Sequence, residues 1–142
     1  MDAPVLVAVI SAAASLFASA LTFFLTKKKE REAEWRKQKL ESYKELLSSM
    51  NGAVGKQATF EARSRLAYMV NHIMLVGAPP VLVALRALLD EIAHHGPNLS
   101  SNRHDELLTE LMYAIREDLG IEPNRADKDF QFKLWSAGNN AI

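Results

Sequence analysis

The stretch that decides the fold is APVLVAVISAAASLFASALTFFLT, residues 3–26. It contains no charged residue, and a cluster of positive charges follows it directly, at Lys27, Lys28, Lys29 and Arg31. A helix over residues 5–25 would be about 30 Å long at about 1.5 Å per residue, which matches the hydrocarbon core of a bilayer. The sequence therefore predicts an N-terminal transmembrane helix over residues 1–26.

A cleavable secretory signal is the competing interpretation of this segment. Such a signal has basic residues before its apolar stretch, whereas here Asp2 precedes the stretch and the basic cluster follows it. Because Lys and Arg accumulate on the cytoplasmic side of membrane helices, we expect the N-terminus outside and the chain after Lys27 in the cytoplasm, with a bacterial inner membrane as the location. The basic cluster can serve as this topology signal or bind anionic lipid headgroups.

Small and hydroxyl-bearing side chains share one side of the predicted membrane helix. At about 100° per residue, one narrow stripe contains Ala8, Ser11, Ala12, Ser15, Ser19, Thr22 and Thr26. Lipid gives no hydrophobic drive between helices, so close approach over small residues is how membrane helices associate, and the stripe predicts self-association. Two alternatives remain: a hydroxyl-lined aqueous pore, and hydroxyls that only bond to the carbonyl four residues earlier.

The rest of the chain has the apolar spacing of helices. We expect a basic stalk helix over residues 27–51 and a cytoplasmic antiparallel helical bundle with a short C-terminal helix over residues 52–142, so the fold class is all-α. Gly52 and Gly55 predict the turn that ends the stalk. The side chains that we expect to be buried on the stalk are Leu40, Tyr43, Leu47 and Met50.

Three further helices are predicted after the stalk. The second runs from about residue 56 to 76 and is closed by Gly77 in the left-handed conformation, and the third runs from about 80 to 95. The fourth is capped within residues 98–102 and closed by Gly120. We expect these buried side chains: Ala62, Leu66, Val70, Ile73 and Met74; then Val81, Leu82, Leu85, Leu88, Leu89 and Ile92; then Leu107, Leu108, Leu111, Met112, Ile115 and Leu119. The aromatic residues of the last helix are Phe130, Phe132 and Trp135.

Composition and motifs argue against most enzyme classes. The 17 Lys and Arg residues balance the 17 Asp and Glu residues, which argues against nucleic acid as a partner, and the chain has no cysteine. No phosphate loop, dinucleotide fingerprint, nucleophile elbow or HExxH helix occurs. The remaining candidate metal ligands, His94, His95 and His104, lack a completing carboxylate or thiolate, so we expect surface histidines, no metal and no cofactor.

One pair of residues has a spacing known from catalysis. Arg65 and His72 are two helical turns apart and share a face with Glu61 and Tyr68. The pair fits the R-x4-6-H motif of HEPN ribonucleases, in which His moves a proton and Arg stabilises the charge that develops on a phosphodiester. A solvated polar helix face explains the same four residues without any catalysis.

The overall layout combines one N-terminal span, a stalk with WRKQKLESYKELL and a helical body ending in LMYAIREDLGI. It resembles a group of small, poorly characterised bacterial single-pass membrane proteins. In plan it is also similar to the pore-forming accessory membrane proteins of type VI-B CRISPR systems, which have a divergent HEPN-like body. That resemblance implies Arg65 and His72 as motif positions and a Ser and Thr stripe that faces a shared axis.

Three functional hypotheses follow. The first is a homo-oligomeric membrane effector that forms a pore or depolarises the membrane in antiviral defence, with lipids and further copies of the chain as its partners. The second is a passive tether that holds a cytoplasmic protein partner at the membrane. The third is a membrane-bound HEPN-like ribonuclease, whose cleavage of RNA would be lost in His72→Ala.

Overall fold

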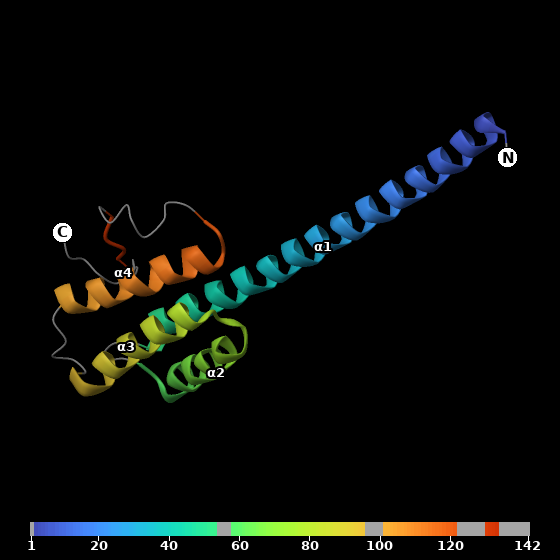
Figure 1. Cartoon of the computed structure of the whole chain (residues 1–142). Helices are drawn as coiled ribbons and strands as arrows, with labels where there is room; N and C mark the ends of the chain where they lie inside the picture. Colours follow the sequence, from blue (N-terminus) through green and yellow to red (C-terminus); the bar gives the residue numbers. More distant parts are fainter. Residues whose placement is uncertain (1, 54–57, 96–100, 122–129, 134–142) are drawn as a thin grey trace. The chain divides into compact units, whose positions relative to one another are not determined.

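The computed structural model of the chain describes residues 2–53, 58–95, 101–121 and 130–133, and within these ranges all regular secondary structure is α-helical. The four helices, in chain order, are α1 (Ala3–Ala53), α2 (Phe60–Val76), α3 (Pro79–His95) and α4 (Ser101–Asp118) (Figure 1). The prediction of an all-α chain is therefore confirmed. The chain divides into two compact units, Met1–Gln38 and Lys39–Ile142, and α1 contributes residues to both.

The first unit consists of the N-terminal part of α1. Every residue from 2 to 38 is exposed, and three of the largest apolar side chains, Leu16, Phe17 and Phe24, are 70–76% exposed. By length and composition α1 can cross a membrane, and no part of its apolar segment is buried inside the chain. The predicted apolar helix is confirmed, and its place in a membrane stays a prediction.

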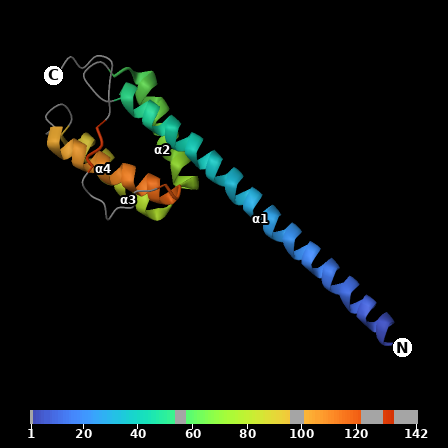
Figure 2. The same cartoon turned by 90° about the horizontal axis from the view of Figure 1, so that it is seen from above.

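The second unit contains the hydrophobic core, to which all four helices contribute. Its buried side chains are Tyr43, Leu46 and Met50 on α1, Met69, Val70 and Ile73 on α2, Val81, Leu85 and Leu88 on α3, and Leu107, Leu108, Leu111, Ala114, Ile115 and Leu119 on α4 and the turn after it. The helices α3 and α4 pack along each other (Figure 2). The two helices with the strongest apolar spacing therefore form the most extensive contact in the described core.

The end of α4 follows the prediction. Gly120 has a φ of 66°, the left-handed conformation that glycine adopts without a steric penalty. The N–H of Ile121 donates to the carbonyl of Arg116 at 2.8 Å, and the N–H of Gly120 donates to the carbonyl of Glu117 at 3.0 Å. These two hydrogen bonds are those of a Schellman motif, which satisfies the last carbonyls of the helix.

The beginning of α2 lies later than predicted. The helix starts at Phe60, because the Thr59 hydroxyl accepts a hydrogen bond from the N–H of Ala62 at 3.2 Å and thereby caps the N-terminus. At the end of α1, Gly52 lies inside the helix rather than in a turn, and Gly55 lies outside the described residues. The expected start near residue 56 was therefore wrong. The hydrogen bond from the threonine cap, and not the apolar spacing, sets the first residue of the helix.

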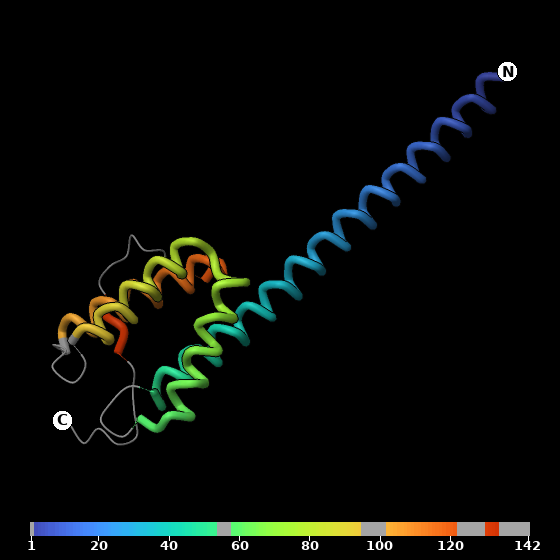
Figure 3. The backbone as a smooth tube through the Cα atoms, turned by 90° about the horizontal axis from the view of Figure 1, so that it is seen from below, coloured from blue at the N-terminus to red at the C-terminus, as the bar shows by residue number. Residues whose placement is uncertain are grey.

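The prediction for Gly77 was wrong in its physical cause. Its φ of −76° and ψ of 144° are extended backbone that any residue adopts, and its N–H donates to the carbonyl of Ile73 at 2.8 Å. A Cβ atom at this position would lie 2.9 Å from the Ile73 carbonyl oxygen and 3.2 Å from Leu82 Cδ2. Glycine is required because space is short where α2 turns into α3 (Figure 3).

We expect Gly77→Ala to destabilise the protein by about 1–3 kcal/mol, the usual cost of overpacking. The new methyl group would meet a backbone oxygen, which cannot rotate away as a side chain can. Gly52→Ala is the matched control, because its Cβ would lie 3.9 Å from the nearest atom considered, in ordinary contact, and alanine favours a helix. Thermal unfolding of the full chain in detergent compares the two, and equal melting temperatures would contradict the explanation.

Two helix faces are rotated slightly from their expected positions. Leu46 is fully buried whereas Leu40 is 39% exposed, and Met69 is 3% exposed whereas Met74 is 60% exposed. In each case the predicted residue and the buried one lie about 120–140° apart around the helix, at opposite edges of its apolar side. The spacing of 3.6 residues identifies an apolar side, but the neighbouring helices decide which of its edges is covered.

The predicted C-terminal helix is not found where the structure describes the tail. Residues 130–133 are not helical, and Leu134 and Trp135 lie outside the described residues. The N–H of Phe132 instead donates to the Thr109 hydroxyl at 3.0 Å, and its ring meets the Tyr113 ring edge-on at 5.3 Å. The expected packing of aromatic tail residues on the helical body is thus seen for Phe132, without a helix.

Candidate functional site

The small-residue stripe of α1 is the first candidate site, defined as Ala8, Ser11, Ala12, Ser15, Ser19, Thr22 and Thr26. Three of its hydroxyls donate to backbone carbonyls four residues earlier: Ser15 to Ser11 at 2.9 Å, Ser19 to Ser15 at 2.8 Å, and Thr22 to Ala18 at 2.8 Å. These hydroxyls can therefore enter an apolar medium without losing a hydrogen bond. The stripe presents small side chains, and three of its hydroxyls have their acceptors within the same helix, which suits close helix contact.

The basic cluster after the stripe, Lys27, Lys28, Lys29 and Arg31, is exposed. Within α1, Lys27 pairs with Glu30 at 2.7 Å and Lys28 lies 3.9 Å from Glu32. Exposed pairs of this kind contribute only about 0.3–0.5 kcal/mol each. Their effect is to support the helix, and they leave the lysines at the surface, where lipid headgroups or solvent can meet them.

The structure places Arg65 and His72 on α2 in different surroundings. Arg65 is exposed, as are Glu61 and Tyr68, whereas His72 is half-buried and its Nε2 lies 3.0 Å from the Ser42 hydroxyl of α1. No described contact joins Arg65 to His72. The imidazole therefore serves as a contact between α1 and α2 in this structure, and the catalytic role stays a hypothesis.

Of the histidines considered as metal ligands, the two whose side chains the structure describes, His94 and His104, have different partners. His94 Nδ1 lies 2.6 Å from the Asp90 carbonyl oxygen on its own helix, and His104 Nδ1 lies 3.7 Å from Asp105 Oδ1. The side chain of His95 lies outside the described ones. Within the described ranges, no group of three or more His, Asp or Glu side chains could hold a metal ion.

A polar cluster in the second unit was missed by the sequence reasoning. Lys39 Nζ lies 2.7 Å from Asp118 Oδ1 and 3.0 Å from Asp118 Oδ2, and the Tyr43 hydroxyl donates to the same carboxylate. The exposed fractions of the Lys39 and Asp118 side chains are 14% and 9%, and Tyr43 is 1% exposed. The cluster joins the first turns of α1 in this unit to the end of α4. Its partners are 75 and 79 residues apart in sequence, which no helical spacing reveals.

Burial and the neighbouring Asp118 carboxylate raise the pKa of Tyr43. Burial of the phenol is the largest cause, followed by its hydrogen bond to Asp118 and by repulsion between that carboxylate and a phenolate, which together hold the pKa well above its usual value near 10. The native state therefore keeps this proton at a pH where the unfolded chain releases it. Ionisation of Tyr43 therefore lowers the free energy of unfolding, and it does so only in alkaline solution.

We expect the stability of the protein to fall as the pH rises above about 10, with Tyr43 contributing up to about 1.4 kcal/mol per pH unit. The sign follows from proton binding: above pH 10 the unfolded state binds fewer protons at Tyr43 than the native state, so higher pH favours unfolding. Melting temperatures of the full chain in detergent at pH 8 and 11 measure this. Tyr43→Phe is the control, and an equally large alkaline loss in that variant would contradict the assignment.

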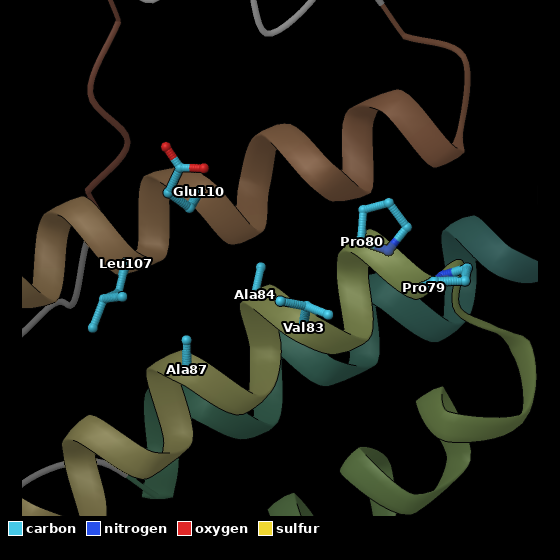
Figure 4. A pocket seen from close by; sticks show the side chains of 7 residues that line it. All are labelled: Pro79, Pro80, Val83, Ala84, Ala87, Leu107 and Glu110. Carbon is cyan, nitrogen blue, oxygen red and sulfur yellow. The ribbon is translucent and has the colours of Figure 1, made fainter.

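An apolar groove of about 440 Å³ lies between α3 and α4 in the second unit. Figure 4 shows its walls, which are formed by Pro79, Pro80, Val83, Ala84, Ala87, Leu107 and Glu110. The lining is hydrophobic apart from the single carboxylate of Glu110. A groove of this composition can receive an apolar side chain of a partner.

No family model, no curated protein and no solved structure matches this chain.

Proposed function

We propose that this chain is a single-pass protein of the bacterial inner membrane that self-assembles into a homo-oligomer and acts on the membrane, as a pore or depolarising effector in antiviral defence. The observation that supports this proposal is the charge-free segment of residues 3–26, whose side chains are exposed throughout. The core of the second unit uses none of these side chains.

The exposure of this segment favours a membrane over water. Burial of a side chain such as Leu16, Phe17 or Phe24 is worth about 1.5–3 kcal/mol each, so a row of them left in water would be strongly unfavourable. A core helix of a soluble protein would be mostly buried inside its own chain, which this segment is not. A bilayer supplies the missing apolar surroundings, and the helical backbone satisfies its own hydrogen bonds there.

The proposed orientation places the N-terminus outside and the second unit in the cytoplasm. Lys27, Lys28, Lys29 and Arg31 stand at one end of the apolar segment, and Asp2 stands at the other. Basic residues close to a membrane helix are retained on the cytoplasmic side. At that position they also meet the anionic headgroups of the inner leaflet.

Self-assembly is supported by the small-residue stripe. The spacing of Ser11, Ser15 and Ser19 lets two backbones approach closely, and the hydroxyls of Ser15 and Ser19 bond within their own helix. Close contact therefore requires no exchange of hydrogen bonds between copies. An assembly of such helices around one axis is the form that would permeabilise a membrane.

The decisive test is the state of the full chain after extraction from membranes. We expect it to resist alkaline carbonate, to dissolve only with detergent, and to form a particle whose protein mass is a multiple of 15.8 kDa. Mass spectrometry should find residues 3–26 still attached. A soluble chain that begins after Thr26 would overturn the membrane assignment, and a monomeric particle would overturn self-assembly.

An adaptor that tethers a cytoplasmic partner to the membrane is the second candidate, and the groove between α3 and α4 favours it. Purification from cells would then yield one stoichiometric partner, whereas liposomes containing the purified chain would show no conductance. Conductance without any partner would instead support the effector. Val83→Arg, which places a charge on the wall of the groove, should release a partner bound there.

A further inference from the structure

The helix α2 has two different faces. One face packs into the core through Met69, Val70 and Ile73. The opposite side, the outward face, consists of seven exposed residues: Phe60, Ser64, Ala67, Tyr68, Asn71, Met74 and Leu75. Four of them are large and 60–87% exposed, and none of the seven carries a charge. An uncharged face with so much exposed apolar surface is typical of a contact surface rather than of a solvated helix side.

The outward face has the spacing of a coiled-coil seam. Phe60, Ser64, Ala67, Asn71 and Met74 follow each other at intervals of four, three, four and three residues. This is the alternation of the two seam positions of a heptad repeat, and a single asparagine at one of them fixes register in parallel pairs. The core contacts of the helix use positions away from the seam, so one helix can serve both surfaces at once.

We infer that the outward face of α2 binds the same face of a second copy of this chain, in a parallel pair of helices. In that pairing each seam residue meets its own counterpart. Ser64 and Ala67 are small and allow the backbones to approach, whereas Phe60 and Met74 close the two ends of the contact. The Asn71 amides meet at the same level, where each can donate to and accept from the other.

The residues beside the seam complement each other in this pairing. In parallel coiled coils a residue flanking the seam contacts the residue five positions later in the partner helix. Arg63, whose guanidinium donates to the Ala58 carbonyl at 3.2 Å, would face the ring of Tyr68 in the second copy, a cation–π contact. This contact occurs twice in a symmetric pair, so the groups beside the seam fit a copy of the same helix.

The small size of the contact ties it to the membrane. A stable interface buries about 1,200–2,000 Å² in total, more than one pair of helices about 25 Å long can supply. Copies confined to one bilayer have a high effective concentration, which makes a weak contact effective. The inference thus rests on the proposed function and deepens it: the α1 segments hold copies together in the membrane, and the outward faces of α2 join their helical bodies.

Cysteine cross-linking of the full chain in isolated membranes tests this directly, because the chain has no cysteine of its own. We expect Asn71→Cys to give a covalent dimer as the main product after mild oxidation, because paired seam positions lie within reach of a disulfide. The matched control is Asn102→Cys, the same substitution at an exposed residue of α4. Cross-linking that needs a mixture of Ala67→Cys and Asn71→Cys chains would show antiparallel pairing and overturn the proposal.

A second variant tests the contact by repulsion. Ala67→Arg places two like charges opposite each other at the centre of the seam and should abolish the Asn71→Cys dimer, whereas Ala93→Arg, at an exposed residue of α3, should leave it intact. Unchanged helical circular dichroism verifies that both variants fold. If the wild-type particle is oligomeric but oxidised Asn71→Cys gives no covalent dimer, this inference fails while self-assembly stands. A monomeric wild-type particle contradicts both.

Discussion

Asp118→Ala should destabilise the helical body by about 3–5 kcal/mol, the usual effect of removing one partner from a buried ion pair. The substitution leaves the Lys39 ammonium nearly buried without its carboxylate, and it removes the acceptor of the Tyr43 hydroxyl. The ammonium and the hydroxyl would both stay removed from water without the carboxylate that binds them, which costs free energy. Since about 1 kcal/mol shifts the melting temperature of a body of this size by roughly 4–8 °C, the loss should exceed 10 °C.

Asp90→Ala is the matched control for this prediction. Asp90 lies 3.7 Å from Arg86, but these side chains are 62% and 82% exposed, so the same substitution should change stability by about 0.5 kcal/mol or less. The double variant Lys39→Met with Asp118→Leu should recover much of the loss, because it replaces the charged groups by apolar ones of similar size. Equal melting temperatures for Asp118→Ala and Asp90→Ala would show that the polar cluster has no structural role.

Ala12→Leu should break the oligomer into smaller particles, whereas Ala13→Leu should leave it unchanged. Ala12 belongs to the small-residue stripe, and Ala13, one residue later, lies about 100° around the helix and outside the stripe. Both substitutions add the same apolar volume and favour membrane insertion equally. A leucine within the stripe separates helices that would otherwise touch over small side chains, and Ser15→Leu should act in the same way.

Particle mass in detergent measures the outcome, and conductance of liposomes gives a second readout. Both variants must first be recovered from the membrane fraction in equal amount, which separates assembly from insertion. If both leucines disrupt the particle, the contact does not distinguish faces of the helix. If neither does, the stripe has no partner and its hydroxyls serve only their own backbone.

The helices and their ends were predictable to the extent that local interactions set them. The charge-free segment, Pro79 at the start of α3 and the left-handed Gly120 after α4 depend on residues within one or two turns. The errors arose where packing against other parts of the chain decided the outcome. Gly77 is required because a Cβ atom there would meet the Ile73 carbonyl oxygen at 2.9 Å and Leu82 Cδ2 at 3.2 Å, and Met69 rather than Met74 is buried because of the helices that lie against α2.

The candidate sites divide in the same way. The stripe on α1 can be found from spacing alone, since its members lie on one helix and their hydroxyl bonds are local. The contact of His72 with Ser42 joins two helices, so the spacing of residues along one helix could not predict it. The outward face of α2 became visible only when the core contacts showed which apolar residues remained exposed.

By itself the sequence determined that the chain is helical and that its first apolar segment needs apolar surroundings. Both properties follow from hydrogen bonding and hydration within a single segment. The tertiary structure alone decided that Lys39, Tyr43 and Asp118 meet, and which side of α2 stays exposed. These features depend on how distant helices pack, because a contact across 75 or more residues leaves no periodic trace in the chain.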